Sequence, residues 1–464
     1  MIAIGLIISF IVGIFLTLSI SRRLSWVEVL GLAFPLGIGL QTFLIVCMDW
    51  AGIHLTARSV IIATFVVIAG LGVYLFWRRK QVAEWSKTLF KFGYPTVNWL
   101  WLLGIAAIAV VVIVNVTKTM YYPTFDTDSV RGFNLMGMAV AHEGTIKNLS
   151  IFTDVNFLPI QRGGGSYLTY VPLSQLSYAY VYMLGAETSK VANALIFISF
   201  ALAFYGVLRR FATPTLTVLT TFFVLITPEM LGFSSMSGTN FTHAVYASLG
   251  ILYFVTYFYK KVPSLLWVSA ALLMLNNWTR SEGVAFIGAA CCVLLWQSIQ
   301  TKQYKQLIFF GLLCIFPFLF YNVFLKVHHL ESVQVFILKP FWDAEKMGTI
   351  FKEVWILFNS ATFYGVTFVL FFFVMLSNVW SIYKRRDHLV TLVLIVFSWL
   401  FYTFLVYQID YIWDSILNVL HYSYKRFLFS FVPLVWFYIA VNHNVTWVFG
   451  KIDRFVFPTP KKSK

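Results

Sequence analysis

The chain of 464 residues is too apolar and too weakly charged for a soluble protein. Hydrophobic residues make up 60%, aromatic residues 19% and charged residues 11%, whereas soluble domains carry about 25% charged residues. The composition predicts an all-α integral membrane protein and excludes disordered, collagen-like and disulfide-rich classes. The net charge of +16 would indicate nucleic-acid binding in a soluble protein, but in a membrane protein its distribution across the bilayer is examined first.

Thirteen apolar runs approach the roughly 20 residues that a membrane-spanning helix needs. They predict a bundle of about thirteen transmembrane helices. In chain order the predicted spans are 2–20, 28–48, 59–77, 97–117, 189–208, 213–231, 243–259, 264–278, 283–300, 306–325, 354–380, 388–408 and 427–443.

The connectors between the predicted spans carry very unequal charge. Alternate connectors, together with the C-terminal tail, hold 21 of the 34 Lys and Arg residues but only 4 of the 18 Asp and Glu residues. The positive-inside rule places this basic set in the cytoplasm, with the N-terminus outside and the C-terminus inside. Because topology accounts for the basic excess, no nucleic-acid partner is expected.

Residues 168–185 are apolar enough for a further span, but a span there would move every later basic connector to the outside. We therefore predict a helix lying at the outer membrane interface, where tyrosine side chains suit the headgroup zone. The tyrosines in and beside this segment are Tyr167, Tyr170, Tyr178, Tyr180 and Tyr182.

The first long outer loop divides the sequence into three parts. Residues 1–117 are predicted N-terminal transmembrane helices, and residues 118–188 an extracytoplasmic catalytic loop with the interfacial helix. Residues 189–464 are a transmembrane bundle with short outer loops and a basic cytoplasmic tail. Long loops in compact proteins are usually functional or disordered, and the aromatic, acidic and glycine residues of 118–188 argue against disorder.

The long loop opens with two acidic residues directly after a predicted span. At the membrane edge, Asp126 and Asp128 are candidates for a general base, because partial desolvation raises the pKa of a carboxylate. Two neighbouring carboxylates also suit a divalent cation such as Mg²⁺ or Mn²⁺. Taken alone, the Asp-x-Asp pattern favours a solvated loop start.

Other polar residues on the outer side favour a functional interpretation. Arg280 and Glu282 occupy a very short connector near membrane depth, where ionisable residues are costly and usually functional; a tight outer turn is the alternative. Lys425 and Arg426 oppose the charge bias of the outer face, and their side chains suit phosphate oxygens. The residues expected to line the same cleft are Tyr170, Asn240, His243 and His421.

Four short motifs, taken in order, resemble those of the GT-C glycosyltransferases, polytopic enzymes that take a sugar from a polyprenyl-phosphate carrier. The similarity is to the aminoarabinose-transferase and protein-mannosyltransferase branches. It departs from their pattern at Ser129, the second residue of an Asp-Glu pair, and at Asn240, where many relatives keep an acid, so metal dependence stays open. The motifs are Asp128-Ser-Val-Arg131, Tyr170-Val-Pro-Leu173, Thr279-Arg-Ser-Glu-Gly283 and Tyr424-Lys-Arg-Phe-Leu428.

The resemblance implies a GT-C-like bundle with juxtamembrane helices in its first outer loop. It also implies transfer of a hexose or pentose from a polyprenyl-phosphate donor to a hydroxyl of a glycan, lipid or protein. The expected place is the extracytoplasmic face of the bacterial inner membrane, in contact with membrane lipids. No cofactor beyond a divalent cation is implied.

The chemistry assigns roles to the candidate residues. Asp128 is the expected base, with Asp126 as its support or as a metal ligand. A single in-line displacement of polyprenyl phosphate inverts the anomeric carbon. Glu282 is expected to orient Arg280, and Arg131 to orient Asp128 from one helical turn away. The cations expected around the donor phosphate are Arg131, Arg280, Lys425 and Arg426.

Two other functional classes fit a polytopic chain. A transporter or flippase also has many spans and intramembrane charges, but the sequence has no pair of Gly- or Pro-broken helices in matching halves. A polysaccharide polymerase or ligase would need an arginine-rich outer loop, whereas residues 118–188 contain only Arg131 and Arg162. Gradient-independent consumption of a polyprenyl-phosphate sugar distinguishes the enzyme from the transporter.

Overall fold

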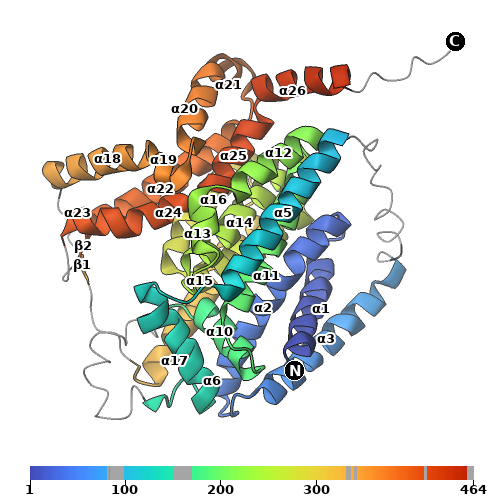
Figure 1. Ribbon diagram of the computed structural model, residues 1–464, viewed down its shortest axis with the longest axis vertical. Helices are drawn as coiled ribbons and strands as arrows, with labels where there is room; N and C mark the ends of the chain where they lie inside the picture. The colour runs from blue at the N-terminus through green and yellow to red at the C-terminus, as the bar shows by residue number, and fades with distance from the viewer. Residues whose placement is uncertain are drawn as a thin grey trace.

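A computed structural model of the chain describes residues 1–80, 83, 99–150, 170–330, 336–338, 342–411 and 415–456. These residues are almost entirely helical (Figure 1). The elements up to the end of the first outer loop are α1 (Ile2–Ile20), α2 (Trp26–Trp50), α3 (Ala57–Trp77), α5 (Trp99–Tyr121), the π-helix η1 (Ser129–Phe133), α6 (Asn134–Glu143) and α10 (Leu173–Met183).

The rest of the chain adds a long series of helices and one short antiparallel pairing, in which β1 (Phe336–Leu338) runs beside β2 (Ile409–Tyr411). The helices are α11 (Lys190–Leu208), α12 (Pro214–Leu225), α13 (Pro228–Phe233), α14 (Asn240–Lys260), α15 (Ser264–Thr279), the 3-10 turn η3 (Ser281–Gly283), α16 (Val284–Thr301), α17 (Lys305–Val327), α18 (Ala344–Phe358), α19 (Ala361–Tyr364), α20 (Thr367–Ser377), α21 (Val379–Arg385), α22 (Leu389–Gln408), α23 (Ile416–Val419), the π-helix η4 (Leu420–Tyr424), α24 (Lys425–Phe429), α25 (Val432–Val441) and α26 (His443–Val456).

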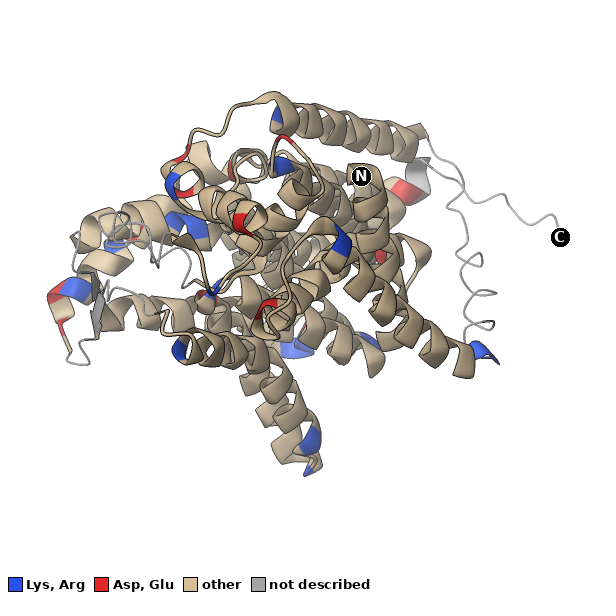
Figure 2. Cartoon of the chain, turned by 90° about the horizontal axis from the view of Figure 1, so that it is seen from below, with Lys and Arg blue, Asp and Glu red and all other residues tan. Residues whose placement is uncertain are grey.

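In the described part of the chain, nine helices are long and apolar enough to cross a membrane. The number rises to eleven if two bent pairs each count as one span. The first pair is α20 and α21, and the second is the segment from α23 to α24 followed by α25. Most of the ribbon in Figure 2 carries no charged residue, as helices surrounded by hydrocarbon require. The prediction of a multi-pass, all-helical membrane protein is therefore confirmed.

The number of thirteen spans stays a prediction, because four predicted spans do not form single long helices. One of them, 427–443, is divided between α24 and α25. Residues 213–231 form the 12-residue α12 followed by α13, and residues 264–278 form the 16-residue α15. Twelve helical residues rise about 18 Å, less than the roughly 30 Å of bilayer hydrocarbon. The run 354–380 is divided among α18, α19, α20 and α21, and the prediction of one continuous span there is wrong.

Helix α14 forms the centre of the bundle. It is buried at every position from Asn240 to Tyr257, and α11, α15 and α16 pack against it. A helix that is apolar and buried on all sides belongs to the interior of a large bundle. Its first turn carries Asn240 and His243, so these polar residues are held by a rigid central element.

Glycines allow α1 and α2 to approach each other closely. A Cβ atom on Gly13 would overlap the carbonyl oxygen of Ala33, and one on Gly37 would overlap that of Ser9. Gly31 faces the backbone of α11 in the same way. Small residues at helix interfaces are the usual means of close backbone contact in membranes. The three helices therefore form a tightly fitted unit.

We expect Gly37→Ala to destabilise the protein by about 1–3 kcal/mol, the usual cost of overpacking a filled core. Gly70 of α3 is the matched control, because a Cβ there would meet no atom within 4 Å. Gly70→Ala should be neutral or stabilising, since alanine favours the helix by up to about 1 kcal/mol. Thermal unfolding of both variants in detergent measures the difference, and equal melting temperatures would contradict the packing described.

The first outer loop is fixed to the end of α2. The carboxylate of Asp49 accepts hydrogen bonds from the hydroxyl of Thr145 (2.8 Å) and from the backbone N–H groups of Ile146 (3.1 Å) and Lys147 (3.0 Å). Gly144 ends α6 with φ +67°, a conformation that favours glycine. In Figure 1, α6 and α10 lie at the lower end of the bundle and α26 at the upper end.

Helix α10 is buried inside the protein. Its positions 173–181 are all buried, and it packs against α6, α2 and α11. The hydroxyl of Tyr178 donates to the carbonyl oxygen of Gly238 (2.8 Å) and that of Tyr180 to Gly5 (3.1 Å). The prediction that these tyrosines face lipid headgroups is therefore wrong, because buried phenols need internal hydrogen-bond partners and find them here.

Candidate functional site

An ion pair connects the first outer loop to the segment before the last predicted span. The guanidinium of Arg426 donates from Nη1 to Oδ2 of Asp128, and 298 residues separate the two along the chain. Asp128 directly precedes η1. Arg426 is the second residue of α24, which begins directly after η4. π-Helical turns are frequent at functional sites. A predicted base and a predicted phosphate-binding cation thus lie together.

A second ion pair lies in the connector between α15 and α16. Arg280 donates from Nη2 to Oε1 of Glu282 (2.7 Å) and from Nε to Oε2 (3.3 Å). Its Nη1 donates to Oδ1 of Asn240 (2.5 Å) and to Oγ1 of Thr239 (3.4 Å). The carboxylate therefore orients the guanidinium, which in turn connects this turn to the start of α14.

Tyr170 lies close to both ion pairs. Burial raises the pKa of its phenol, and the charges that act on it come from both pairs: Glu282 and Asp128 raise the pKa, whereas Arg280 and Arg426 lower it. The ring packs edge-on against Phe133 of η1, with centroids 5.6 Å apart. Three segments of the chain, which hold Asp128 with Phe133, Arg280 with Glu282, and Arg426, thus meet around one phenol.

Asp126 has a different environment from Asp128. Its Oδ1 accepts the backbone N–H of Ser129 (2.9 Å) and its carbonyl oxygen that of Val130 (3.0 Å). Oδ2 is buried and has no hydrogen-bond partner in the described part of the chain. Asp126 therefore fixes the start of η1, the element that positions Asp128.

The buried Lys190 was missed by the sequence analysis. It begins α11 with only 2% of its surface exposed, and its Nζ donates to the carbonyl oxygen of Tyr122. Its charge interacts with that of Asp126. The signal available in the sequence was a lysine at the first turn of the predicted span 189–208, where a charge is costly.

Lys425 has a different direct partner from Arg426. Its ammonium lies 4.4 Å from the ring centroid of Phe363 in α19, a cation–π geometry. Its carbonyl oxygen accepts the hydroxyl of Tyr364 (2.6 Å). The charges of Lys425 and Arg426 both act on the carboxylate of Glu229 in α13, so the two cations share this neighbour although their direct partners differ.

His243 follows Asn240 by about one turn in α14. Its ring packs between Phe286 and Phe427, with centroid distances of 6.0 and 6.3 Å. It is 2% exposed, and neither ring nitrogen has a hydrogen-bond partner among the residues that the structure describes. The charges of Arg280 and Glu282 act on it. His243 is therefore a buried neighbour of the pair of Arg280 with Glu282.

Arg131 and His421, two further predicted residues, lie apart from both ion pairs. Arg131 is exposed on η1, and within the described ranges it forms no ion pair, so Asp128 pairs with Arg426 instead. His421 is exposed, and its Nδ1 lies 3.7 Å from Oε2 of Glu353 on α18. Arg131 is closer to Asp128 in the sequence, but the tertiary fold places Arg426 beside the carboxylate of Asp128.

The residues that do come together are Asp128, Arg426, Tyr170, Arg280, Glu282, Asn240 and His243, and we call them the outer cluster. It combines two carboxylates with two guanidinium groups at partly exposed positions. Such a set can accept a proton and hold a phosphate. Among the described residues, no three His, Cys, Asp or Glu side chains gather as metal ligands.

No family model, curated protein or solved structure matches the chain.

Proposed function

We propose that the protein is a GT-C-type membrane glycosyltransferase, which moves a sugar from a polyprenyl-phosphate carrier to an acceptor hydroxyl with inversion. The observation that supports it is the ion pair between Asp128 and Arg426, which places a candidate base beside a candidate phosphate ligand. Tyr170 and the pair of Arg280 with Glu282 complete the arrangement. The proposal includes a bundle of about thirteen spans in the bacterial inner membrane and a glycan, lipid or protein acceptor.

In the proposed reaction the acceptor hydroxyl attacks the anomeric carbon and transfers its proton to Asp128. The bond from the anomeric carbon to the phosphate oxygen breaks, and polyprenyl phosphate leaves with the electron pair. Arg426 holds the negative charge that develops on the phosphate, since cations preorganised at such a position lower the barrier.

The orientation of the chain is part of the proposal, with the outer cluster on the extracytoplasmic face. In a background without native cysteines, we expect Asn148→Cys to react with an impermeant thiol reagent from outside only. Arg385→Cys should react only after the cytoplasmic face is opened. Both side chains are exposed, so burial does not limit labelling. Reaction of both from the same side would contradict the topology.

The lipid that copurifies with the protein tests the substrate class. Mass spectrometry of gently extracted protein should detect a polyprenyl phosphate or its glycosylated form, and Arg426→Ala should lower the amount recovered. Arg58→Ala is the matched control, because Arg58 is an exposed arginine at the start of α3. Recovery of bulk phospholipid alone, equal in all three proteins, would count against a polyprenyl-phosphate donor.

A further inference from the structure

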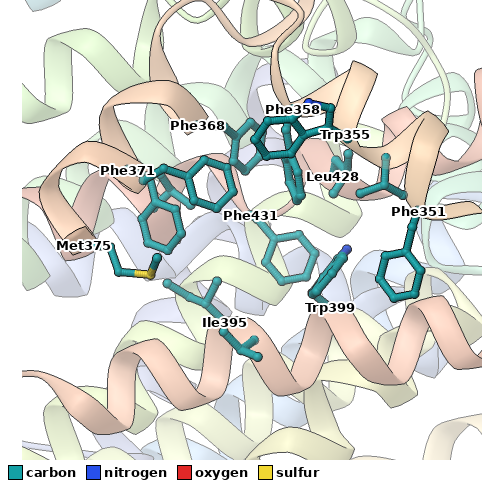
Figure 3. A pocket seen from close by; sticks show the side chains of 14 residues that line it. Phe351, Trp355, Phe358, Phe368, Phe371, Met375, Ile395, Trp399, Leu428 and Phe431 are labelled. Carbon is teal, nitrogen blue, oxygen red and sulfur yellow. The ribbon is translucent and has the colours of Figure 1, made fainter. Parts of the chain in front are cut away.

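Two pockets of the protein differ in the chemistry of their walls. The pocket in Figure 3 is lined mostly by aromatic side chains. The other pocket, of about 210 Å³, is polar and lies where α14 and α16 end and α17 begins. Among the described residues, none that lines this polar pocket is acidic. Its polar lining includes Tyr257, Lys261, Gln297, Ser298, Gln303 and Gln306.

The polar pocket lies at the opposite end of the bundle from the outer cluster. Helix α14 begins at Asn240 of the outer cluster and ends at Lys260, and α16 begins directly after η3 and ends at Thr301. The 21 residues of α14 rise about 32 Å, which matches the roughly 30 Å of bilayer hydrocarbon. The polar pocket is therefore at the depth of the other membrane surface.

Hydrogen bonds between three side chains connect the walls of the polar pocket. Gln297 of α16 donates from Nε2 to the hydroxyl of Tyr257 (3.3 Å), which donates to Oε1 of Gln306 (3.2 Å) on α17. Oε1 of Gln297 is buried and has no hydrogen-bond partner in the part of the chain that the structure describes. Because buried polar atoms normally have a partner, this oxygen is suited to accept a hydrogen bond from a ligand.

The charge around the polar pocket is positive. Lys261 lines the pocket, and its ammonium is held 4.5 Å from the ring centroid of Phe258, a cation–π contact. Between residues 257 and 306 of the sequence the one acid is Glu282, which belongs to the outer cluster. The lysines at this end of the three helices are Lys260, Lys261, Lys302 and Lys305. An anionic ligand is therefore favoured over a cationic one.

The surface next to the polar pocket is apolar. Trp296 and Ile299 of α16 are exposed beside the lining residues Gln297 and Ser298, and Ile308 of α17 is exposed two residues after Gln306. A tryptophan near the end of a span is typical of the membrane interface. A lipid headgroup can therefore enter the pocket while its acyl chains lie along the exposed faces of α16 and α17.

We propose that the polar pocket binds the headgroup of an anionic phospholipid, with its phosphate at Lys261 and a headgroup hydroxyl at Oε1 of Gln297. Phosphatidylglycerol is the simplest lipid with both groups. Basic pockets between spans on the cytoplasmic side are suited to such headgroups. The volume of about 210 Å³ is below the roughly 300–1,000 Å³ of drug-sized ligand sites, so the pocket suits a headgroup and not a whole lipid. The site does not depend on sugar transfer, because it shares no residue with the outer cluster.

The test compares two lysines that follow the ends of α14 and α16. Lys261 and Lys302 have φ +54° and +56°, a conformation that glycine adopts without strain, and only Lys261 lines the pocket. Native mass spectrometry of the full-length protein in detergent, titrated with phosphatidylglycerol, measures the affinity. Lys261→Gly should weaken binding by about tenfold or more, as loss of a hydrogen bond to a charged group does, and Lys302→Gly should keep the wild-type affinity. Equal affinity in the two variants would overturn the proposal.

The headgroup hydroxyl is tested with phosphatidylmethanol, which has the same charge as phosphatidylglycerol but no headgroup hydroxyl. The wild-type protein should bind phosphatidylglycerol more tightly, and Gln297→Leu should bind the two lipids equally. Gln300→Leu is the matched control, because Gln300 is exposed on the same helix, and it should keep the preference. A wild-type protein without this preference, or one that binds zwitterionic phosphatidylethanolamine as tightly as phosphatidylglycerol, would overturn the proposal.

Photo-crosslinking of the unmodified protein covers the case in which a variant does not fold. Phosphatidylglycerol with a diazirine on the acyl chain, close to the ester, should label peptides from α16 or α17, and labelling confined to other helices would overturn the assignment. Soluble glycerol 3-phosphate at the concentration of the probe should not prevent labelling. If it does, the pocket takes a soluble phosphate ester and the lipid assignment is overturned.

Discussion

Asp128→Asn should lower sugar transfer by about 100-fold or more while donor binding persists. Asparagine keeps the shape of the side chain but cannot accept the proton of the acceptor hydroxyl, and general-base catalysis contributes about 10²–10⁴-fold. Initial rates with a polyprenyl-phosphate sugar, beside donor affinity measured on the same preparation, separate the two effects. A melting temperature for each preparation shows whether loss of the ion pair with Arg426 also affects folding.

Asp126→Asn is the matched variant in the same loop. Because Asp126 Oδ1 accepts the backbone N–H of Ser129, and asparagine is an equally good cap, this variant should retain most of the activity. An active Asp128→Asn protein beside an inactive Asp126→Asn protein would reverse the two roles. Full activity in both would remove the loop from the chemistry.

Arg426→Ala should weaken donor binding by about 10- to 100-fold, because a hydrogen bond to a charged group contributes about 1.5–3 kcal/mol. Arg426→Lys should be intermediate, since an ammonium keeps the charge but not the planar fork of donors. Titration with a nonhydrolysable donor analogue measures the effect. Arg58→Ala provides the control for general loss of positive charge, because Arg58 is an exposed arginine outside the outer cluster.

Arg280→Ala extends this test to the second ion pair. The variant leaves the carboxylate of Glu282 without its partner, so its folding has to be measured with its donor affinity. Unchanged donor affinity in both Arg426→Ala and Arg280→Ala would place the carrier phosphate elsewhere in the protein.

Hydropathy predicted the long helices because a span is a property of composition and length. Hydropathy could not predict where an apolar run bends. The run 354–380 is apolar throughout, yet Gly365 takes φ +58° after α19, and the chain bends by 54° between α20 and α21. Tyr178 and Tyr180 are a similar case. The local sequence does not distinguish a tyrosine at the membrane interface from a buried tyrosine that donates to a carbonyl oxygen.

The candidate site was predictable in its residue types and in the local pairing of Arg280 with Glu282, but not in the long-range pairing of Asp128. Asp128, Arg280, Glu282 and Arg426 were recognisable as charges in an apolar chain. The choice of Arg426 over Arg131 as the partner of Asp128 depends on packing across 298 residues, which no local pattern contains.

Sugar transfer by the purified protein tests the central claim most directly. In liposomes without any ion gradient, the protein should convert a polyprenyl-phosphate sugar to polyprenyl phosphate when an acceptor is present, and the product should have the inverted anomeric configuration. Asp128→Asn should abolish this conversion in the same vesicles. Movement of the intact lipid across the bilayer without cleavage of the sugar–phosphate bond, unaffected by Asp128→Asn, would contradict the account and identify a transporter.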